Sequence, residues 1–569
     1  MKEETGELND RWAALIVDFL IQQKVDYFCL SPGLRLTPLA IAIANHPEAK
    51  AFIHFDERGS AFHALGYAKA TGRPAAIVST SGTAAGNLFP AIMEASLSYT
   101  PLIVLTADRP PELRNVADKQ TADQVKLFGN YVRFAVDLPT PSPALSHSYL
   151  ATTIAQSVFI SLQAPIGPVH LNCMFREPLF SEKPMTLSSS PALNYDSCAP
   201  YPSDELLTKW ATNLSQYEKG IILLGVLPEQ INKSAIIDFA KKLKWPIFPD
   251  IFSGFRTDQS TIAYYDLILK SLPEMPAHAL LHLGDRYVSK TVLEWLQRVK
   301  PKRCFQVIGH PLRADPAHMI TDRVLCAPDV FCEALLPLIP EKDSTWTQQW
   351  KILDQKVEET LRTYFSEQRE LSEASLFFVL QNCLSPETPL FLANSMPVRD
   401  AGFFLSQKTL GKFFGNRGVA GIDGNIATSV GLAQGLKSPL VSVIGDQAGL
   451  HDLNSLAQMK KADYPVTLII INNKGGGIFS FLPISKKQYL FEEFFAASHE
   501  FSFESAAKLF DLPYYRFQQA DDLSSFFQTP LQTSCLIEIE TDRKENFHLH
   551  QEIYQKVQEC LLSVSCTAF

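Results

Sequence analysis

The chain has 569 residues, 46% of them hydrophobic and 20% charged, with 27 glycines and 37 prolines. This composition is that of an ordinary globular protein and excludes disordered, collagen-like and coiled-coil classes. Lys and Arg number 51 against 60 Asp and Glu, and a net charge of −9 argues against binding a phosphate backbone, so we predict no nucleic-acid partner. At roughly 150 residues per domain, the length predicts three or four domains.

The cysteines and the first residues indicate an intracellular protein. None of the ten cysteines forms a C-x-x-C pair, so neither a zinc site nor a disulfide framework is expected, and the thiols are predicted to be reduced and mostly buried. The opening segment MKEETGELND lacks the apolar stretch of a signal peptide, and the longest apolar runs have only the length of a strand. We therefore expect a cytoplasmic protein with no membrane insertion.

The first third of the sequence alternates short apolar runs, small-residue turns and helical segments. Strands are predicted at 27–30, 51–55, 75–78 and 101–106, each followed by a turn that contains polar residues. Strands that alternate with helices form a parallel sheet, and ligands bind at the carboxyl ends of its strands. We expect the four turns to lie together on that edge.

Two changes of composition divide the chain into three parts. Segment 180–204 is rich in Ser and Pro and has no periodicity, which predicts an interdomain linker. A second α/β block follows, and a third begins near Pro389 after the charged helical stretch 350–370. The predicted strands of the second block are 220–224, 246–249, 279–283 and 303–308. The expected fold is α/β with three domains, at 1–182, 200–340 and 350–569, each a mostly parallel sheet flanked by helices.

Polar residues follow two predicted strands that are joined by one helix in the third block. Asp446 follows strand 441–444, and Asn473 follows strand 466–471. Two parallel strands joined in this way end side by side, so a carboxylate and an amide oxygen should converge. With the carbonyl freed by the glycine turn 475–477, these oxygens suit Mg²⁺. The same glycines would let backbone N–H groups approach a phosphate.

A Gly-Asp pair after a strand is usually a solvated turn, but its spacing from Asn473 matches the thiamine-diphosphate signature, in which Mg²⁺ anchors the cofactor's diphosphate. The signature usually has a small residue where this chain has Gln447, which leaves the ligands intact and changes the local packing. The helix between the two strands is predicted to be continuous, with Leu453, Leu456 and Met459 facing inward.

A thiamine-diphosphate enzyme also needs a carboxylate against N1′ of the aminopyrimidine ring, because protonation there favours the imino tautomer that removes the C2 proton. Glu57 fits this role, since it follows strand 51–55 and opens the predicted helix 59–70. The alternative is a solvated glutamate that the helix dipole stabilises. The small-residue turn and helix start at 81–87, a companion feature of these enzymes, favours the catalytic assignment.

The resemblance extends to one family. The segments that carry it are HFDERGSAFHALGYAKATGRPAAIVSTSGTAAGNLFPA, LTADRPPEL, GNRGVAGIDG, NNKGGGIFSFLP and ETDRKENFHLH, and they resemble the 2-succinyl-5-enolpyruvyl-6-hydroxy-3-cyclohexene-1-carboxylate synthases of menaquinone biosynthesis. The resemblance implies decarboxylation of 2-oxoglutarate on thiamine diphosphate with Mg²⁺ or Mn²⁺, and 1,4-addition of the succinyl carbanion to isochorismate. It also implies a homodimer or a dimer of dimers with active sites between subunits.

Family resemblance also assigns site residues by motif position. Cofactor binding is implied for Glu57, Ser81, Gly82, Asn87, Ile422, Gly445, Asp446, Asn473, Gly475, Gly476 and Ile478, with Glu57 catalytic, Ile422 beneath the bent cofactor, and Asp446, Asn473 and Gly475 on the metal. Substrate binding is implied for Arg35, Arg109, Gln120, Lys290, Ser395, Arg399, Arg417, Ile478, Phe479 and Leu482. Arginines suit two dicarboxylate substrates because the guanidinium fork bonds a carboxylate bidentately, whereas a single arginine is more often in a surface ion pair.

Three departures from the family pattern concern the surroundings of the substrates. The pattern SPGSRS is SPGLRL here, so Leu34 and Leu36 replace hydroxyl side chains, Lys119 replaces an asparagine, and ASH at 497–499 replaces TPH. Two alternatives follow. One is another thiamine-diphosphate 2-oxoacid decarboxylase or carboligase, which would not share the arginine set. The other is a catalytically silent paralogue that acts as a binding subunit.

Overall fold

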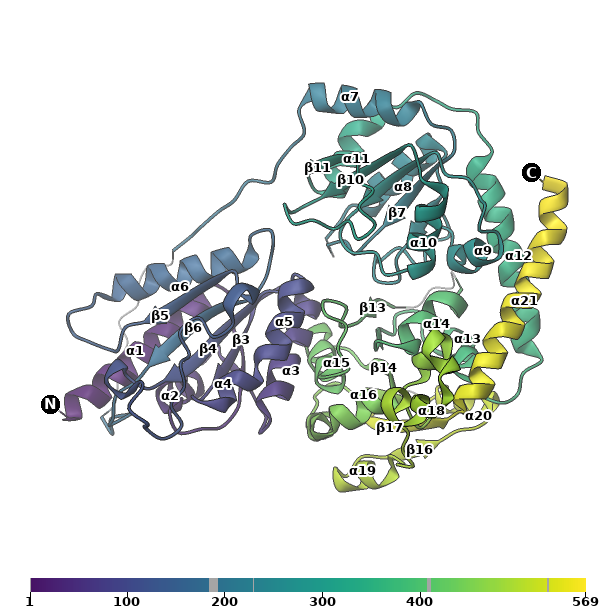
Figure 1. The fold of residues 1–569 in the computed structure, drawn as a ribbon. Coiled ribbons are helices and arrows are strands. Elements are labelled where there is room, and N and C mark those ends of the chain that lie inside the picture. Colours follow the sequence, from purple (N-terminus) through teal and green to yellow (C-terminus); the bar gives the residue numbers. More distant parts are fainter. Residues whose placement is uncertain (1, 184–192, 229, 407–410, 530–531, 569) are drawn as a thin grey trace.

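The computed structural model describes residues 2–183, 193–228, 230–406, 411–529 and 532–568, which form three parallel sheets flanked by helices (Figure 1). The N-terminal and C-terminal sheets have six strands each, and the middle sheet has five. The predicted α/β architecture is confirmed. None of the described helices is both long enough and apolar enough to cross a membrane. The cysteines whose side chains are described are free and mostly buried, as expected.

The N-terminal sheet has the strand order β2-β1-β3-β4-β6-β5. Its elements are α1 (Lys2–Gln22), β1 (Tyr27–Leu30), α2 (Thr37–Asn45), β2 (Lys50–Ile53), α3 (Glu57–Thr71), β3 (Ala75–Ser79), α4 (Thr83–Asn87), α5 (Phe89–Leu97), β4 (Leu102–Asp108), the 3-10 helices η1 (Pro111–Leu113) and η2 (Gly129–Tyr131), β5 (Phe134–Leu138), α6 (His147–Leu162) and β6 (Val169–Met174). Strands β1, β3 and β4 are buried along their whole length, which explains their continuous apolar sequence. The four predicted strands are confirmed with small shifts of their ends.

The middle sheet has the order β11-β10-β9-β7-β8. Its elements are α7 (Asp204–Ser215), β7 (Gly220–Leu224), α8 (Lys233–Leu243), β8 (Ile247–Pro249), α9 (Tyr265–Ser271), β9 (Ala279–Leu283), α10 (Lys290–Val299), β10 (Arg303–Ile308), β11 (Asp322–Leu325), α11 (Pro328–Leu335) and the 3-10 helix η3 (Leu336–Leu338). The four predicted strands are confirmed, and β11 was not predicted. The predicted linker lies between β6 and α7, and residues 184–192 of it fall outside the described residues.

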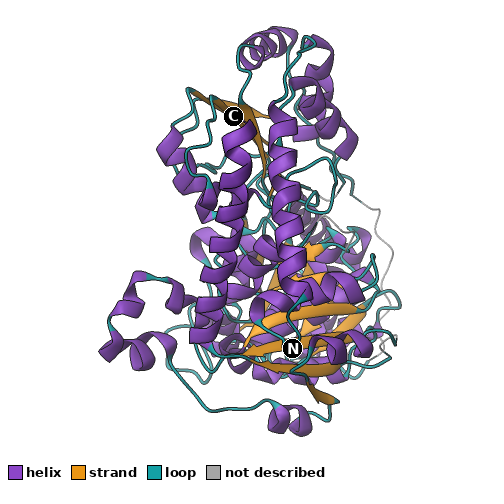
Figure 2. Ribbon diagram, turned by 90° about the vertical axis from the view of Figure 1, so that its right-hand side faces the viewer, coloured by secondary structure: helices purple, strands orange, loops and turns teal. Residues whose placement is uncertain are grey.

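The C-terminal sheet has the order β13-β12-β14-β15-β17-β16. Its elements are α12 (Trp346–Ser366), α13 (Glu373–Cys383), β12 (Leu390–Leu392), α14 (Met396–Phe404), β13 (Phe413–Phe414), α15 (Asn425–Leu436), β14 (Leu440–Gly445), α16 (Asp446–His451), η4 (Leu453–Ser455), α17 (Leu456–Lys460), β15 (Val466–Asn472), η5 (Gly477–Phe481), η6 (Pro483–Lys486), α18 (Gln488–Leu490), the π-helix η7 (Phe491–Ala496), α19 (Glu504–Leu509), β16 (Tyr514–Arg516), α20 (Ala520–Phe526), β17 (Cys535–Glu540) and α21 (Arg543–Ala568). Counted from the start of each domain, this strand order is identical to that of the N-terminal sheet. The long helices α12 and α21 lie side by side (Figure 2).

The predicted continuous helix between β14 and β15 is wrong. The segment is divided into α16, η4 and α17. The division falls at buried Asp452, whose Oδ2 accepts the backbone N–H groups of Ile426 at 2.8 Å and Ala427 at 3.0 Å. Leu456 and Met459 are buried as predicted, whereas Leu453 is only partly buried because it lies in the irregular turn.

Helices α3 and α15 join the N-terminal and C-terminal domains by direct backbone contact (Figure 1). Each follows the second strand of its own sheet, so they are equivalent elements of the two domains. A Cβ atom on Gly66 would lie 2.1 Å from the Thr428 carbonyl oxygen, and one on Gly431 would lie 2.0 Å from the His63 carbonyl oxygen. The two backbones therefore approach too closely for any side chain at these glycines.

We expect Gly431→Ala to lower the free energy of unfolding by about 1–3 kcal/mol, because its methyl group has backbone in its place and the two helices must separate. The matched control is Gly402→Ala in α14, where the added Cβ would meet no atom within 4 Å. That control should be neutral or stabilising, since alanine favours a helix. Chemical denaturation measures both, and equal stabilities of the two variants would contradict the backbone contact.

Candidate active site

The structure brings Asp446 and Asn473 to the same edge of the C-terminal sheet. Strands β14 and β15 pair in parallel with Gly445 opposite Ile471, and the Gly475 N–H donates to Asp446 Oδ2 at 2.9 Å. The Asn473 amide donates through Nδ2 to Glu373 Oε1 at 2.9 Å. Its Oδ1 atom is buried and accepts no hydrogen bond within the described part of the chain.

This arrangement fits a metal-bound diphosphate. A buried carboxylate and an amide oxygen without a donor are oxygen ligands of the kind that Mg²⁺ takes. Beside them, a Cβ atom on Gly445 would meet no atom within 4 Å, so there is open space at the end of β14. Residues Asp446, Asn473 and the turn at Gly475 could hold the metal.

The glycines of this turn also have a packing role that the sequence did not predict. A Cβ atom on Gly475 would lie 2.6 Å from the Ala496 carbonyl oxygen, and one on Gly476 would lie 2.7 Å from the Phe479 ring. The N–H groups of the two glycines donate to Asp446 and to the Ala496 carbonyl. Close packing on η7 and φ of +151° at Gly475 therefore require these glycines, and neither N–H group is free for a phosphate in this structure.

Two residues distant in sequence lie beside the proposed metal ligands, and sequence reasoning missed the first of them, Glu373. Glu373, the first residue of α13, is 1% exposed and also accepts a hydrogen bond from Thr541 at 3.2 Å, so it fixes which way the Asn473 amide faces. Burial, and then the buried carboxylate of Asp400, raise the pKa of Glu373 to about 7. The Nε2 atom of His499 lies 3.4 Å from Asp446 Oδ2. Glu373 lies far from Asn473 in sequence and no local motif marks it, whereas His499 is in the segment ASH that replaces the family's TPH.

Gln447, the departure from the signature, has a structural role. Its Nε2 donates to the Ala496 carbonyl oxygen at 2.7 Å, the same oxygen that accepts the Gly476 N–H. The longer side chain thereby ties α16 to η7. Nearby, the half-buried Ile478, Phe479 and Leu482 lie in or just after η5, which follows the glycine turn.

Glu57 is the first residue of α3 and is half-buried. The residue before it, Asp56, caps the helix by accepting the Arg58 N–H at 3.0 Å, so Glu57 is not needed as the cap. Its Oε2 accepts a hydrogen bond from Asn87 of α4 at 3.3 Å. Ile422, predicted beneath the cofactor, is 39% exposed in the loop before α15.

A first group of cations lies in the N-terminal domain. Arg35 and Arg109 are both buried. Burial lowers the pKa of the Arg109 guanidinium, and the positive charge of Arg35 nearby lowers it further. Arg109 donates to the Ser81 hydroxyl and lies 3.5 Å from Asp118, and Gln120 donates to the Ser81 carbonyl oxygen at 3.0 Å. Asp118 also lines a cavity of about 380 Å³ within the segment 114–125. Ser81 lies two residues before α4, the helix whose last residue, Asn87, donates to Glu57.

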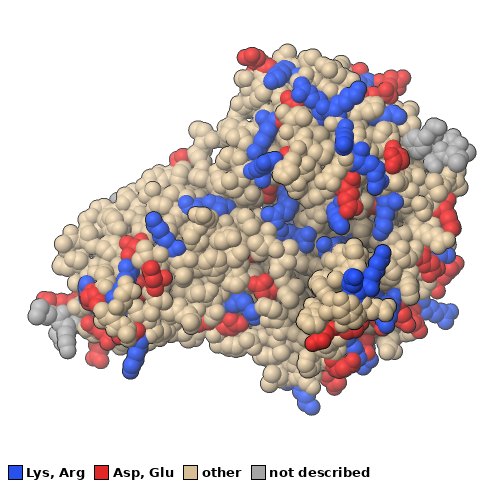
Figure 3. Space-filling view, in the orientation of Figure 1, with Lys and Arg blue, Asp and Glu red and all other residues tan. Residues whose placement is uncertain are grey.

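A second group of cations lies in the C-terminal domain. Arg399 donates to the Ser395 carbonyl oxygen, and Arg417 donates to Asn394 Oδ1. Burial, and then the charge of Arg399, lower the pKa of Arg417 to about 10. Figure 3 shows positive side chains gathered where the middle domain meets the other two. Two neighbouring guanidinium groups of this kind favour a bound anion.

Four further positions singled out in the sequence differ in their burial. Lys290 at the start of α10 is 78% exposed and pairs with Glu294. Leu36, the residue before α2, is 4% exposed and packs in the N-terminal core. Its side chain is therefore in the core and not at the surface of the turn. Leu34 is 73% exposed, and Lys119 is also exposed.

Three family models match the chain: "Thiamine pyrophosphate enzyme, N-terminal TPP binding domain" over residues 10–127, "Middle domain of thiamine pyrophosphate" over 189–392, and "Thiamine pyrophosphate enzyme, C-terminal TPP binding domain" over 399–539. The 2-succinyl-5-enolpyruvyl-6-hydroxy-3-cyclohexene-1-carboxylate synthase of Salinibacter ruber is 38% identical over 97% of this chain and 97% of its own length. The chain belongs to this synthase family. The corresponding synthase of Rubrobacter xylanophilus is also 38% identical, over 97% of this chain and 99% of its own.

Solved structures show the same fold at much lower identity. The benzoylformate decarboxylase of Polynucleobacter necessarius has a TM-score of 0.74 and 14% identity, covering 94% of this chain and 99% of its own. A thiamine diphosphate-dependent 4-hydroxybenzoylformate decarboxylase of Rhodococcus jostii has a TM-score of 0.72 and 15% identity, covering 93% and 99%. The three-domain arrangement is therefore that of thiamine-diphosphate enzymes, and family membership supports thiamine diphosphate as the cofactor.

We expect Asp446→Ala to weaken Mg²⁺-dependent binding of thiamine diphosphate by more than roughly 100-fold, because it removes a metal ligand. Loss of a residue that only orients a ligand costs roughly 10- to 100-fold in affinity. Glu373→Ala should fall within that range, because Asn473 keeps its oxygen and loses its orientation. The control Asp511→Ala removes an exposed carboxylate from the same domain and should change nothing. Calorimetric titration with the cofactor, with and without a chelator, measures all three. Wild-type affinity in Asp446→Ala would refute the metal assignment.

Proposed function

We propose that this chain performs the reaction of its family, the thiamine-diphosphate-dependent decarboxylation of 2-oxoglutarate and addition of the resulting four-carbon unit to isochorismate in menaquinone biosynthesis. The observation that supports this assignment is a pair of arginine groups, one in the same domain as Glu57 and one in the domain of Asp446 and Asn473. A decarboxylase of a monocarboxylate has no need of so many cations. An assay for product with 2-oxoglutarate alone, and then with isochorismate added, tests it. Turnover that does not depend on isochorismate would indicate the simpler decarboxylase.

The cofactor would lie between a carboxylate and a metal. Asp446 and Asn473, with the carbonyl of Gly475, would hold Mg²⁺ or Mn²⁺ on the diphosphate. Glu57 would hold a proton at N1′ of the aminopyrimidine ring. When bound, thiamine diphosphate supplies the carbon nucleophile that attacks the keto carbon of 2-oxoglutarate. The remaining cofactor positions are Ser81, Gly82, Asn87, Ile422, Gly445, Gly476 and Ile478.

The substrate carboxylates would be divided among the arginines. Arg399 and Ser395 would hold 2-oxoglutarate, because Arg399 is exposed in the first turn of α14 and its hydrogen bond to the Ser395 carbonyl oxygen keeps the two residues together. Arg417 is the anchor for isochorismate in the C-terminal domain, and Arg35 and Arg109 are its anchors in the N-terminal domain. Gln120, Lys290, Phe479 and Leu482 complete the proposed substrate site.

The active site is proposed to form between two copies of the chain in a homodimer. Within the described residues, no hydrogen bond or ion pair joins Glu57 or the N-terminal arginines to Asp446, Asn473 or the C-terminal arginines. Two apolar residues that shortly precede Glu57 in the sequence, Ile53 and Phe55, are 56% and 61% exposed. Exposed apolar side chains of this kind favour cover by a second copy.

Glu57→Gln should bind the cofactor normally and slow exchange of its C2 proton by about 10²- to 10⁴-fold, since the amide keeps the shape of the side chain and loses the acid. Hydrogen–deuterium exchange at C2, followed by NMR, gives the rate. An unchanged rate would remove Glu57 from the catalytic role.

Mixing two inactive variants tests the shared site. Coexpressed Glu57→Gln and Asp446→Ala chains form mixed dimers in which one site receives both wild-type residues. We expect about a quarter of wild-type activity from random pairing of the chains in a two-fold dimer. The control, each variant expressed alone, should stay inactive. No recovery in mixtures shown by mass spectrometry to contain mixed dimers would place the whole site within one chain.

A further inference from the structure

A lysine is buried at the contact between the N-terminal domain and the loop that carries Arg417. Lys69, in the last turn of α3, is 11% exposed. Its ammonium group donates to Glu94 Oε1 at 3.2 Å, to the Gly415 carbonyl oxygen at 2.8 Å and to Asn416 Oδ1 at 2.9 Å. These three acceptors use all three of its donors.

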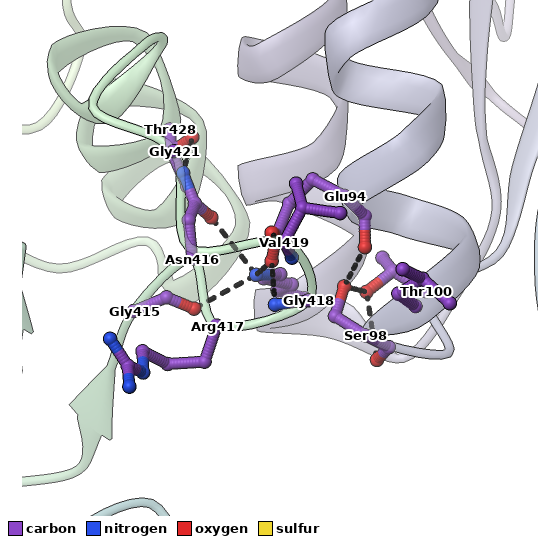
Figure 4. Close-up of polar contacts among 12 residues, drawn as sticks. Glu94, Ser98, Thr100, Gly415, Asn416, Arg417, Gly418, Val419, Gly421 and Thr428 are labelled. Carbon is purple, nitrogen blue, oxygen red and sulfur yellow. Dashed lines mark hydrogen bonds and ion pairs between the residues drawn. The ribbon is translucent and has the colours of Figure 1, made fainter. Parts of the chain in front are cut away.

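The partner carboxylate holds the other side of the same loop. Glu94 of α5 is 1% exposed, and its two oxygens accept the Gly418 N–H and the Val419 N–H, each at 2.8 Å (Figure 4). A Cβ atom on Gly418 would lie 2.5 Å from the Glu94 carbonyl oxygen, so only glycine allows this approach. We call residues 415–419 the Arg417 turn.

The other polar groups of the Arg417 turn are also held by side chains. Asn394 donates to the Asn416 carbonyl oxygen at 2.7 Å, and Arg286 of the middle domain donates to the carbonyl oxygens of Arg417 and Gly418. The side chain of Arg417 extends from the turn away from Glu94 (Figure 4). Its Nε atom is buried and has no hydrogen-bond partner within the described residues.

A buried ion pair is a poor way to gain stability, because desolvation of both charges offsets their attraction. Lys69 and Glu94 nevertheless make four hydrogen bonds to the Arg417 turn and one to each other. They therefore serve to select one conformation of that turn. A glycine-rich turn of this kind has many conformations when nothing holds it.

We propose that Lys69 and Glu94 are positioning residues of the synthase, which act through the Arg417 turn to aim the Arg417 guanidinium at a carboxylate of the isochorismate substrate. The inference rests on the proposed role of Arg417. Neither residue touches the substrate. The N-terminal domain thus contributes to the substrate site of the C-terminal domain of its own chain.

The test compares Glu94→Gln, Arg417→Gln and the double variant in steady-state kinetics. Glu94→Gln keeps the size of the side chain but leaves only one oxygen for two N–H groups. We expect it to raise the KM for isochorismate roughly 10- to 100-fold, as a small misplacement of a binding group does, with the KM for 2-oxoglutarate and the cofactor affinity within about twofold of wild type. In the Arg417→Gln background, Glu94→Gln should change the isochorismate KM by less than about twofold, because it acts through Arg417.

The control is Asp315→Asn in the middle domain. Asp315 also accepts two consecutive backbone N–H groups, those of Met319 at 3.0 Å and Ile320 at 3.2 Å. It should lower the melting temperature without changing either KM. If Glu94→Gln does not fold, Lys69→Met, which removes the donors to Gly415 and Asn416, takes its place in the same comparison.

The outcomes separate this inference from the proposed function. An isochorismate KM that rises in Arg417→Gln but not in folded Glu94→Gln overturns the positioning role and leaves the function intact. Equal rises of both substrates' KM values in Glu94→Gln, or effects that simply add in the double variant, also overturn it. An unchanged isochorismate KM in Arg417→Gln refutes the proposed role of Arg417 itself, and the inference with it.

Discussion

The contact between α3 and α15 is the constraint on which the rest of the structure depends. At Gly66 and Gly431 the helices meet glycine against carbonyl group, so backbone sets their separation at these two points. Helix α3 carries Glu57 at its first turn and Lys69 at its last. The loop before α15 carries Ile422 and, further back, Arg417. One close contact thereby fixes the positions of residues from two domains.

Buried charges in this chain organise turns. Glu94, Asp452 and Asp446 each accept two or more backbone N–H groups of the C-terminal domain, and each ends up beside a loop with proposed cofactor or substrate residues. An accepting carboxylate determines the path of a loop that has few apolar side chains of its own. The free energy spent on burying these carboxylates thus fixes the conformation of the loops that carry the proposed site residues.

Much of the fold followed from local patterns. Each strand that was predicted from an apolar run is present, although others, such as β5, β6 and β11, were not predicted. The position of Asp446 and Asn473 at the ends of β14 and β15 followed from the handedness and order of a single βαβ unit. The identical strand order of the two outer sheets was not predicted. Patterns failed where a contact distant in sequence decides the result. The break at Asp452, the support of Asn473 by Glu373, and the burial of Leu36 all depend on partners that no local motif contains. Glu94 left one trace in the sequence, since it is the only charged residue in α5, a helix of small and apolar residues.

The backbone contact of α3 and α15 also limits how the two domains can move. At Gly66 and Gly431 a carbonyl group of one helix lies against a glycine of the other, so the helices cannot slide past one another without first separating. Sliding of the N-terminal domain along the C-terminal domain of the same chain is therefore opposed at this contact. Segment 114–125 beside Arg109 and η5 to η7 beyond the metal turn lie outside it, so a change of conformation in either does not require the two helices to separate.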